Sequence, residues 1–168
     1  MAISDPNYNP EAEQMFSNAD KKINEGNVQE AHQMLIALTD KFPEFGKAYN
    51  HLGYIYETKY RDAAMADAYY KYALKYAPNY PATYMNYAVV LSTSERFSEL
   101  EELLNKALTV PGMNKDRIYN EFGIMKELQG LYDDAMAYYR KAITYSFVEK
   151  DIELYDKSIN RCNIKKKY

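Results

Sequence analysis

Residues 123–143, "GIMKELQGLYDDAMAYYRKAI", decide the fold because small residues recur among large ones at helical spacing. Gly123, Ala135 and Ala142 stand among Ile, Met and Tyr side chains. A small residue lets two packed helix axes approach to about 8 to 10 Å, and a larger one forces them apart. We therefore predict two helices around the polar break at 128–133, with Gly123 and Ala135 at their crossing and Ala142 making room for the next unit.

The same pattern recurs about every 34 to 35 residues, which is the sequence signature of a repeat architecture. No segment alternates strictly between apolar and polar residues, so we expect no strands. Corresponding positions are Ala19, Gly53, Ala88 and Gly123 in the first helices, and Leu38, Ala73, Ala107 and Ala142 in the second. The predicted repeat region spans 10–146, with repeats near 12–45, 46–80, 81–115 and 116–149.

Helix ends are marked by capping residues and prolines. Asn9, followed by a proline and acidic residues, predicts an N-cap. Ser98 with Glu101, and Ser146 with Glu149, have the spacing of a capping box. Prolines cannot continue a helix and are expected to close the second helices of three repeats, at Pro43, Pro78 and Pro111.

The two ends of the chain differ from the repeats. Residues 1–9 are read as an N-terminal extension and residues 165–168 as a basic tail. Between the repeats and that tail, residues 147–164 carry Tyr155 and Cys162 on one helical stripe. We expect this segment to be a capping helix that covers the exposed apolar end of the repeat stack.

Composition limits the classes of function. The 168 residues include 24 acidic and 21 basic ones, a net charge of -3, which gives no overall attraction to nucleic acid or to an anionic membrane. No run approaches the roughly 20 apolar residues of a membrane span, and the N-terminus lacks the pattern of a secretory signal. The single Cys excludes an intrachain disulfide. We expect a cytoplasmic protein that neither inserts into membranes nor binds nucleic acid.

The repeat pattern resembles the tetratricopeptide repeat family over residues 12–146. The fourth repeat carries the pattern at 119–142, although Lys126 replaces an aromatic residue; the first and third repeats match less well. The second matches best, apart from one extra residue before Ala66, with Tyr49, Leu52, Gly53, Tyr56, Ala66, Tyr70, Ala73 and Pro78. The resemblance implies an all-α, right-handed α-solenoid of about four helix–turn–helix repeats plus the capping helix.

The sequence shows no familiar catalytic, phosphate-binding or metal-binding motif. His32 and His51 stand in different repeats, and Cys162 has no histidine nearby in sequence to activate it. Glutamates at 99, 101 and 102 fit the positive end of a helix dipole better than a metal site. We therefore expect no enzyme activity, no metal and no cofactor.

What the resemblance does imply is a concave groove, lined by the first helix of each repeat, that binds a peptide or a helix. Exposed Tyr54 and Ile124 are expected to anchor the ligand, and asparagines to bond its backbone. Asp20 would repel the carboxylate of a chain terminus. The acidic groove positions, which also include Glu57, Glu121 and Glu127, outnumber the basic Lys47 and Arg117, so a mildly acidic surface is expected. The expected ligand is therefore an internal, apolar to weakly basic segment. The predicted groove residues are Phe16, Asp20, Asn50, His51, Tyr54, Met85, Asn86, Val89, Asn120, Glu121 and Ile124.

Three function classes remain open. The leading interpretation is a non-catalytic protein–protein interaction module. The second is a structural scaffold that assembles with itself as a homo-oligomer, which concentration-dependent mass would reveal. The third is a secretion-type chaperone, which would co-purify with one aggregation-prone client. A repeat family implies a mode of contact and leaves the partner unnamed.

Overall fold

The computed structural model describes residues 8–168, so residues 1–7 of the expected extension lie outside it. Within the described residues all regular secondary structure is helical, which confirms the predicted all-α class. Contacts divide the chain into two compact units, Met1–Val90 and Leu91–Tyr168. Each unit has its own buried apolar cluster and is described by itself.

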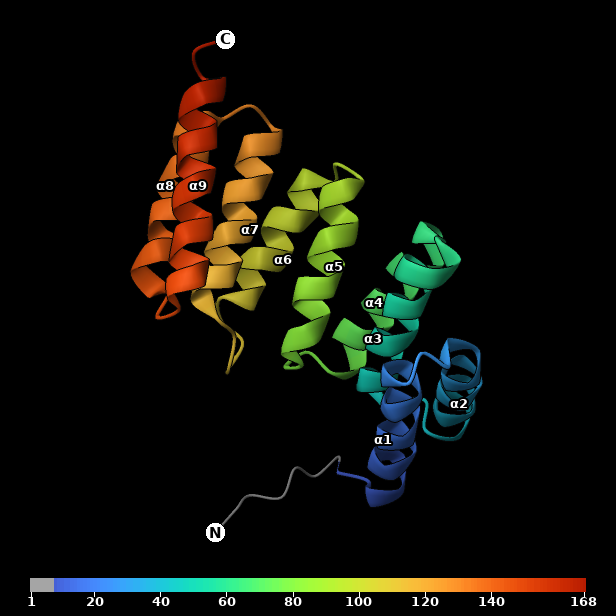
Figure 1. Cartoon of the computed structure of the whole chain (residues 1–168). Helices are drawn as coiled ribbons and strands as arrows, with labels where there is room; N and C mark the ends of the chain where they lie inside the picture. The colour runs from blue at the N-terminus through green and yellow to red at the C-terminus, as the bar shows by residue number, and fades with distance from the viewer. Residues whose placement is uncertain (1–7) are drawn as a thin grey trace. The chain divides into compact units, whose positions relative to one another are not determined.

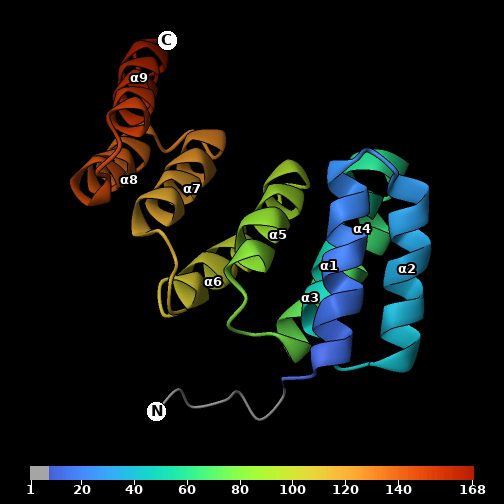
Figure 2. The same ribbon diagram turned by 60° about the horizontal axis from the view of Figure 1, so that its bottom comes forward.

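The first unit is built from antiparallel helix pairs (Figures 1 and 2). Helix α1 packs on α2, α2 on α3, and α3 on α4, so that helices adjacent in sequence are neighbours in space. Its core includes Ala12, Ala19, Leu35 and Leu52, all fully buried. The helices are α1 Pro10–Asn24, α2 Val28–Lys41, α3 Gly46–Ile55, α4 Ala63–Tyr76 and the first part of α5 Pro81–Thr93.

The predicted N-cap of the first helix is confirmed. The side-chain oxygen of Asn9 accepts hydrogen bonds from the backbone N–H groups of Glu11 at 3.0 Å and Ala12 at 3.1 Å. These bonds satisfy two of the donors that a helix start leaves without a partner.

A π-helix, η1 Tyr56–Tyr60, accommodates the extra residue that the sequence places in the second repeat. A π turn contains one residue more than an α turn and so absorbs an insertion without breaking the helix. Arg61 follows in the left-handed conformation, with φ at 56°, and Asp62 caps α4 by accepting from the Met65 N–H at 3.0 Å. The insertion therefore leaves α4 paired with α3 as in a repeat without it.

The second unit contains α7 packed on α8 and α8 packed on α9, with α6 against α7 (Figure 1). The last helix, expected over 147–164, lies at Glu149–Lys165 and buries Tyr155, Ser158, Ile159 and Cys162. It thereby covers the cluster formed by Ala135, Met136 and Tyr139 on α8. The other helices are α6 Phe97–Ala107, α7 Lys115–Leu128 and α8 Tyr132–Tyr145.

Both predicted capping boxes are wrong. Helix α6 begins at Phe97, one residue before Ser98, and its cap residue Arg96 makes no side-chain cap bond. The cap residue of α9 is Val148, whose N–H donates to Ser146 Oγ at 3.3 Å. In each case the predicted serine does not stand at the cap position, because the helix begins at a different residue from the one that the spacing suggested.

The predicted close crossing at Gly123 is confirmed. A Cβ atom on Gly123 would lie 2.5 Å from the ring of Tyr139, and one on Gly53 would lie 2.7 Å from the ring of Tyr70. Both tyrosines are fully buried. The glycines thus give space to an aromatic ring of the partner helix, which fills the crossing.

Across the described residues, no helix is both long and apolar enough to span a bilayer.

Candidate functional site

The predicted groove residues of the first unit form a connected set on α1, α3 and α5. His51 Nε2 lies 3.0 Å from Asp20 Oδ1, which joins α3 to α1. The edge of the Phe16 ring packs against the His51 ring, with the centroids 4.6 Å apart and the planes at 76°. Asp20 and His51 are half-buried, so their bond is shielded from water on one side.

Asn50 connects His51 to the next repeat by two hydrogen bonds. Its Nδ2 donates to His51 Nδ1 at 3.4 Å, and its Oδ1 accepts from Asn86 Nδ2 on α5 at 3.2 Å. The bond at Nδ1 assigns the His51 proton to Nε2, which then donates to the Asp20 carboxylate. We call the chain Asp20–His51–Asn50–Asn86 the polar ladder, and it crosses three successive first helices.

The ladder corrects one expectation. Asn50 is only 2% exposed, and both ends of its amide are bonded within the protein. It therefore supports Asn86 instead of bonding a ligand directly. Sequence spacing placed Asn50, His51 and Asn86 on facing helices, but it could not show that they bond one another.

Charged and aromatic groups flank the ladder. Lys47 Nζ donates to Glu13 Oε1 at 2.6 Å, again joining α3 to α1. Burial raises the pKa of Tyr80, and the negative charges of Asp20 and Glu13 add to that rise. Tyr80 therefore lies near the same acidic groups.

An apolar side of the surface comes from α3 and α5. Tyr54 is 40% exposed on α3, Val89 is exposed on α5, and Met85 is half-buried. The structure thus places apolar side chains on the same helices that carry the ladder.

The remaining predicted groove residues, Asn120, Glu121 and Ile124, lie on α7 in the second unit. Burial raises the pKa of Glu121, and a hydrogen bond from Asn120 opposes the rise. Ile124 is half-buried and packs against the cluster of α8 and α9 residues that includes Tyr139 and Ile159. Ile124 is therefore less exposed than expected, because apolar residues of the second unit cover part of it.

Glu127, expected to be an acidic groove residue, is instead the centre of a buried ion cluster. It is 8% exposed and accepts two hydrogen bonds from Arg161, each at 2.7 Å, one from Lys165 at 2.8 Å and one from Tyr139 at 2.8 Å. The bond to Arg161 is the main reason why the pKa of Glu127 falls to about 2. The only sequence signal was the i, i+4 spacing of Arg161 and Lys165 on the last helix.

A related pair occurs in the second repeat, where Tyr70 Oη donates to Glu57 Oε2 at 2.7 Å. Each glutamate stands four residues after the glycine of its helix crossing. Glu57 and Glu127 are thus engaged with buried tyrosines, so the surface carries less free acidic charge than the sequence suggested.

No group of three or more His, Cys, Asp or Glu residues within 8–168 could hold a metal ion. Burial is the main reason why the pKa of the Cys162 thiol rises to about 11, so the thiolate form is scarce near neutral pH.

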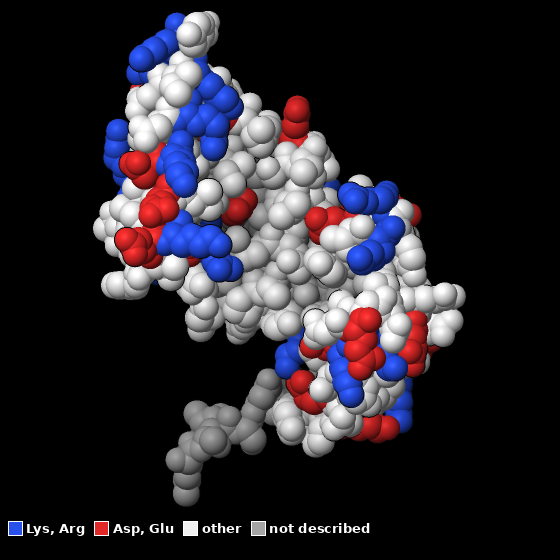
Figure 3. Space-filling view, viewed as in Figure 1, with Lys and Arg blue, Asp and Glu red and all other residues white. Residues whose placement is uncertain are grey.

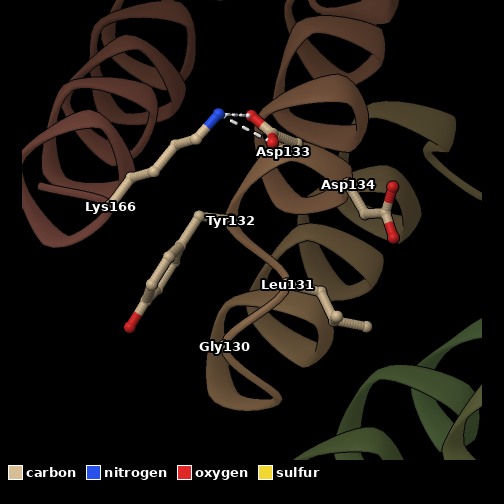
Figure 4. A pocket seen from close by; sticks show the side chains of 6 residues that line it. All are labelled: Gly130, Leu131, Tyr132, Asp133, Asp134 and Lys166. Carbon is tan, nitrogen blue, oxygen red and sulfur yellow. Dashed lines mark hydrogen bonds and ion pairs between the residues drawn. The ribbon is translucent and has the colours of Figure 1, made fainter.

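A pocket of about 370 Å³ lies at the start of α8 (Figure 4). Gly130 to Asp134 line it together with Lys166, whose Nζ lies 2.6 Å from Asp133 Oδ1. Figure 3 shows acidic and basic side chains intermixed over α8 and α9. The basic tail therefore has an acidic partner within the protein.

A tetratricopeptide repeat model matches residues 116–147. No curated protein sequence matches the chain.

Solved structures match nearly the whole chain. PilF of Pseudomonas aeruginosa has a TM-score of 0.79 at 17% identity, covering 93% of this chain and 69% of its own. A thermophilic TPR protein of Thermus thermophilus has a TM-score of 0.70 at 20% identity, covering 88% and 81%. A MamA RS-1 double mutant has a TM-score of 0.76 at 14% identity, covering 94% and 86%. At these identities the likeness concerns the fold alone.

Proposed function

We propose that this tetratricopeptide repeat chain is a non-catalytic protein–protein interaction module. In this proposal a segment of a partner protein lies along α1, α3 and α5 of the first unit. The observation that carries the proposal is the polar ladder, because it fixes side chains of three successive first helices in one bonded row. A preformed row of this kind lowers the entropic cost of binding an extended segment.

Within the row, Asn86 keeps hydrogen-bonding capacity for a ligand. Its bond to Asn50 uses one N–H of its amide, which leaves a second N–H and the carbonyl oxygen. A peptide backbone offers the complementary acceptor and donor. Tyr54, with an aromatic ring and a hydroxyl group at the surface, is the proposed anchor.

The proposed ligand is an internal segment that is apolar to weakly basic. Lys47 is paired with Glu13, so this pair adds no net charge to the surface. The Asp20 carboxylate, which accepts a hydrogen bond from His51, adds a negative charge to this row. That charge favours a basic side chain and opposes a terminal carboxylate.

Affinity capture from native lysate, compared between the wild type and Tyr54→Ala, tests the proposal. A captured segment, once synthesised, should bind the Tyr54→Ala variant more weakly by roughly 1 to 3 kcal/mol in a titration. Tyr60→Ala is the matched control, because Tyr60 is exposed to a similar degree but contacts His32 and Tyr56. Equal binding by the wild type and Tyr54→Ala, or tight binding of acidic C-terminal peptides that Tyr54→Ala weakens, would overturn the proposal.

The proposal places the protein in the cytoplasm, as the sequence suggested. The single Cys is buried and free, so the described structure includes no disulfide that depends on an oxidising compartment. Cell fractionation with an antibody to the chain checks this location, and recovery in another fraction would contradict it.

A further inference from the structure

A second surface, which shares no residue with the polar ladder, lies on α7 and α8 of the second unit. The Tyr119 ring stacks against Tyr145 with centroids 5.3 Å apart, and against Tyr138 at 6.5 Å. The planes of these pairs differ by 28° and 24°. Three tyrosines from two helices thus form one continuous stack.

Two lysines cover this stack. The ammonium group of Lys141 lies 5.0 Å from the centroid of Tyr138 and 5.6 Å from that of Tyr119. Lys115 lies 5.5 Å from the centroid of Tyr145. Among residues 8–168, neither ammonium group has a carboxylate within ion-pair distance, although other lysines of the chain do. These two positive charges are held in place by ring faces and lack anionic partners.

Exposed apolar residues continue the surface along the chain. Tyr145 ends α8 at 44% exposed, and Phe147 and Val148 in the following loop are 99% and 53% exposed. A large, fully exposed Phe two residues after a tyrosine whose ring holds an unpaired cation is typical of an interaction surface. We define the cation-capped surface as Lys115, Tyr119, Tyr138, Lys141, Tyr145, Phe147 and Val148.

We infer that the cation-capped surface binds an acidic segment of a partner protein that also carries apolar side chains. Charge complementarity selects this ligand, because a carboxylate could pair with each lysine while the ring face holds the ammonium group in position. Each ammonium group has three N–H donors, and contact with a ring leaves donors free for a carboxylate. Apolar side chains of the segment would cover Phe147 and Val148.

The equivalent stack in the first unit shows what differs. Tyr49 stacks there on Tyr69 and Tyr76, with centroids 6.3 and 5.7 Å apart, and Lys75 lies over Tyr76. Burial is the main reason why the pKa values of Tyr49 and Tyr69 are raised, and the negative charge of Asp40 adds to the rise, so an acidic group lies near that stack. The acidic ligand is therefore expected at the second unit only.

Nucleic acid fits the cation-capped surface less well. Stacking of bases needs free aromatic faces. Here the faces are occupied by neighbouring rings and by the two ammonium groups. The exposed Phe147 and Val148 also favour aliphatic and aromatic side chains over phosphates.

Selection from a random 12-residue peptide library on the purified full chain tests the inference. Selected peptides should be rich in Asp, Glu and apolar residues. Binding of a labelled selected peptide is measured by fluorescence anisotropy. The double variant with Lys115→Gln and Lys141→Gln should bind the peptide on the order of tenfold more weakly than the wild type. A double variant with Glu at both positions should bind it more weakly still. Affinity should also fall as the NaCl concentration rises.

Two variants serve as matched controls, with circular dichroism as the check on folding. Lys75→Glu changes the lysine that lies over Tyr76 in the stack of the first unit, and Tyr54→Ala changes the proposed groove, so neither should alter binding of the acidic peptide. Selected peptides without acidic enrichment, or unchanged affinity in the Gln double variant, would overturn the inference.

Other outcomes separate this inference from the proposed function. If Tyr54→Ala abolishes binding of the selected peptides, they occupy the groove, which overturns this inference. That result supports the proposed function only where the selected peptides are apolar to weakly basic. Lysine-dependent binding of a labelled 12-residue oligothymidylate, without binding of acidic peptides, would assign the surface to nucleic acid instead.

Discussion

At the scale of single residues, two glycines set how closely paired helices approach. Gly53 and Gly123 each face a buried tyrosine ring of the partner helix, at distances where no Cβ atom fits without movement. The rings cannot withdraw freely, because the hydroxyl groups of Tyr70 and Tyr139 are bonded to Glu57 and Glu127. Each crossing is therefore fixed by one small residue and one bonded aromatic.

Gly123→Leu should lower the free energy of unfolding by more than about 1 kcal/mol, because the new side chain overlaps the Tyr139 ring. Urea unfolding followed by circular dichroism measures the change. Ala137→Leu is the control, since Ala137 is exposed on α8. A Gly123→Leu protein as stable as the wild type would show that this helix crossing is not closely packed.

The stability of the second unit depends on pH through Glu127. Its pKa is about 2 in the folded protein, below the value of about 4.3 expected for an unfolded chain. Because the folded pKa is the lower one, the stabilisation is complete above about pH 4.3 and is lost as the pH falls towards 2. The difference corresponds to at most about 3 kcal/mol.

At about pH 5, Glu127→Gln should therefore be less stable than the wild type. This difference in the free energy of unfolding should shrink to a small fraction as the pH falls to 2. Urea unfolding at a series of pH values measures this. Glu57→Gln is the matched control, because it removes the charge of a glutamate that accepts from a buried tyrosine and leaves the Glu127 cluster intact. A constant deficit of Glu127→Gln over this pH range would contradict the role of the ion cluster.

At the scale of elements, the π-helix keeps two helices in register despite an inserted residue. Deleting Lys59, an exposed residue of η1, should restore an ordinary turn and change stability by less than about 1 kcal/mol. Deleting Gln129, between α7 and α8, should lower the free energy of unfolding by several kcal/mol. That turn has no extra residue, so the deletion would shift α8 and move the Tyr139 ring away from Gly123. Thermal melting compares the two deletions, and equal losses would show that η1 does not absorb an insertion.

At the scale of the whole molecule, the last helix completes the second unit. Removing residues 147–168 would uncover Met136 and Tyr139 and leave Glu127 without Arg161 and Lys165. The shortened protein should melt earlier and aggregate, because the end of a repeat stack needs a cover. Melting temperature and light scattering measure both effects. Removal of 167–168 alone is the control, and unchanged melting after the longer truncation would show that α9 is not a cap.

Much of the fold could be predicted from the sequence, because the small residues and helix caps act locally. Gly123 marked a crossing, Asn9 marked a helix start, and the extra residue before Ala66 was visible in the repeat spacing. Such features depend on sterics and on bonds between residues close in the chain. They can be read without knowledge of which distant side chains meet.

The partners of polar side chains were decided only by the tertiary structure. Glu127 and Asn50 were both assigned to an open groove. Glu127 is instead bonded to basic side chains of α9, and Asn50 is buried within the polar ladder. Ile124 likewise packs on the cluster that α9 completes. The repeat pattern determined which face of a helix each residue occupies. Which residues remain free to bind a partner depends on long side chains arriving from other helices, and local spacing does not specify them.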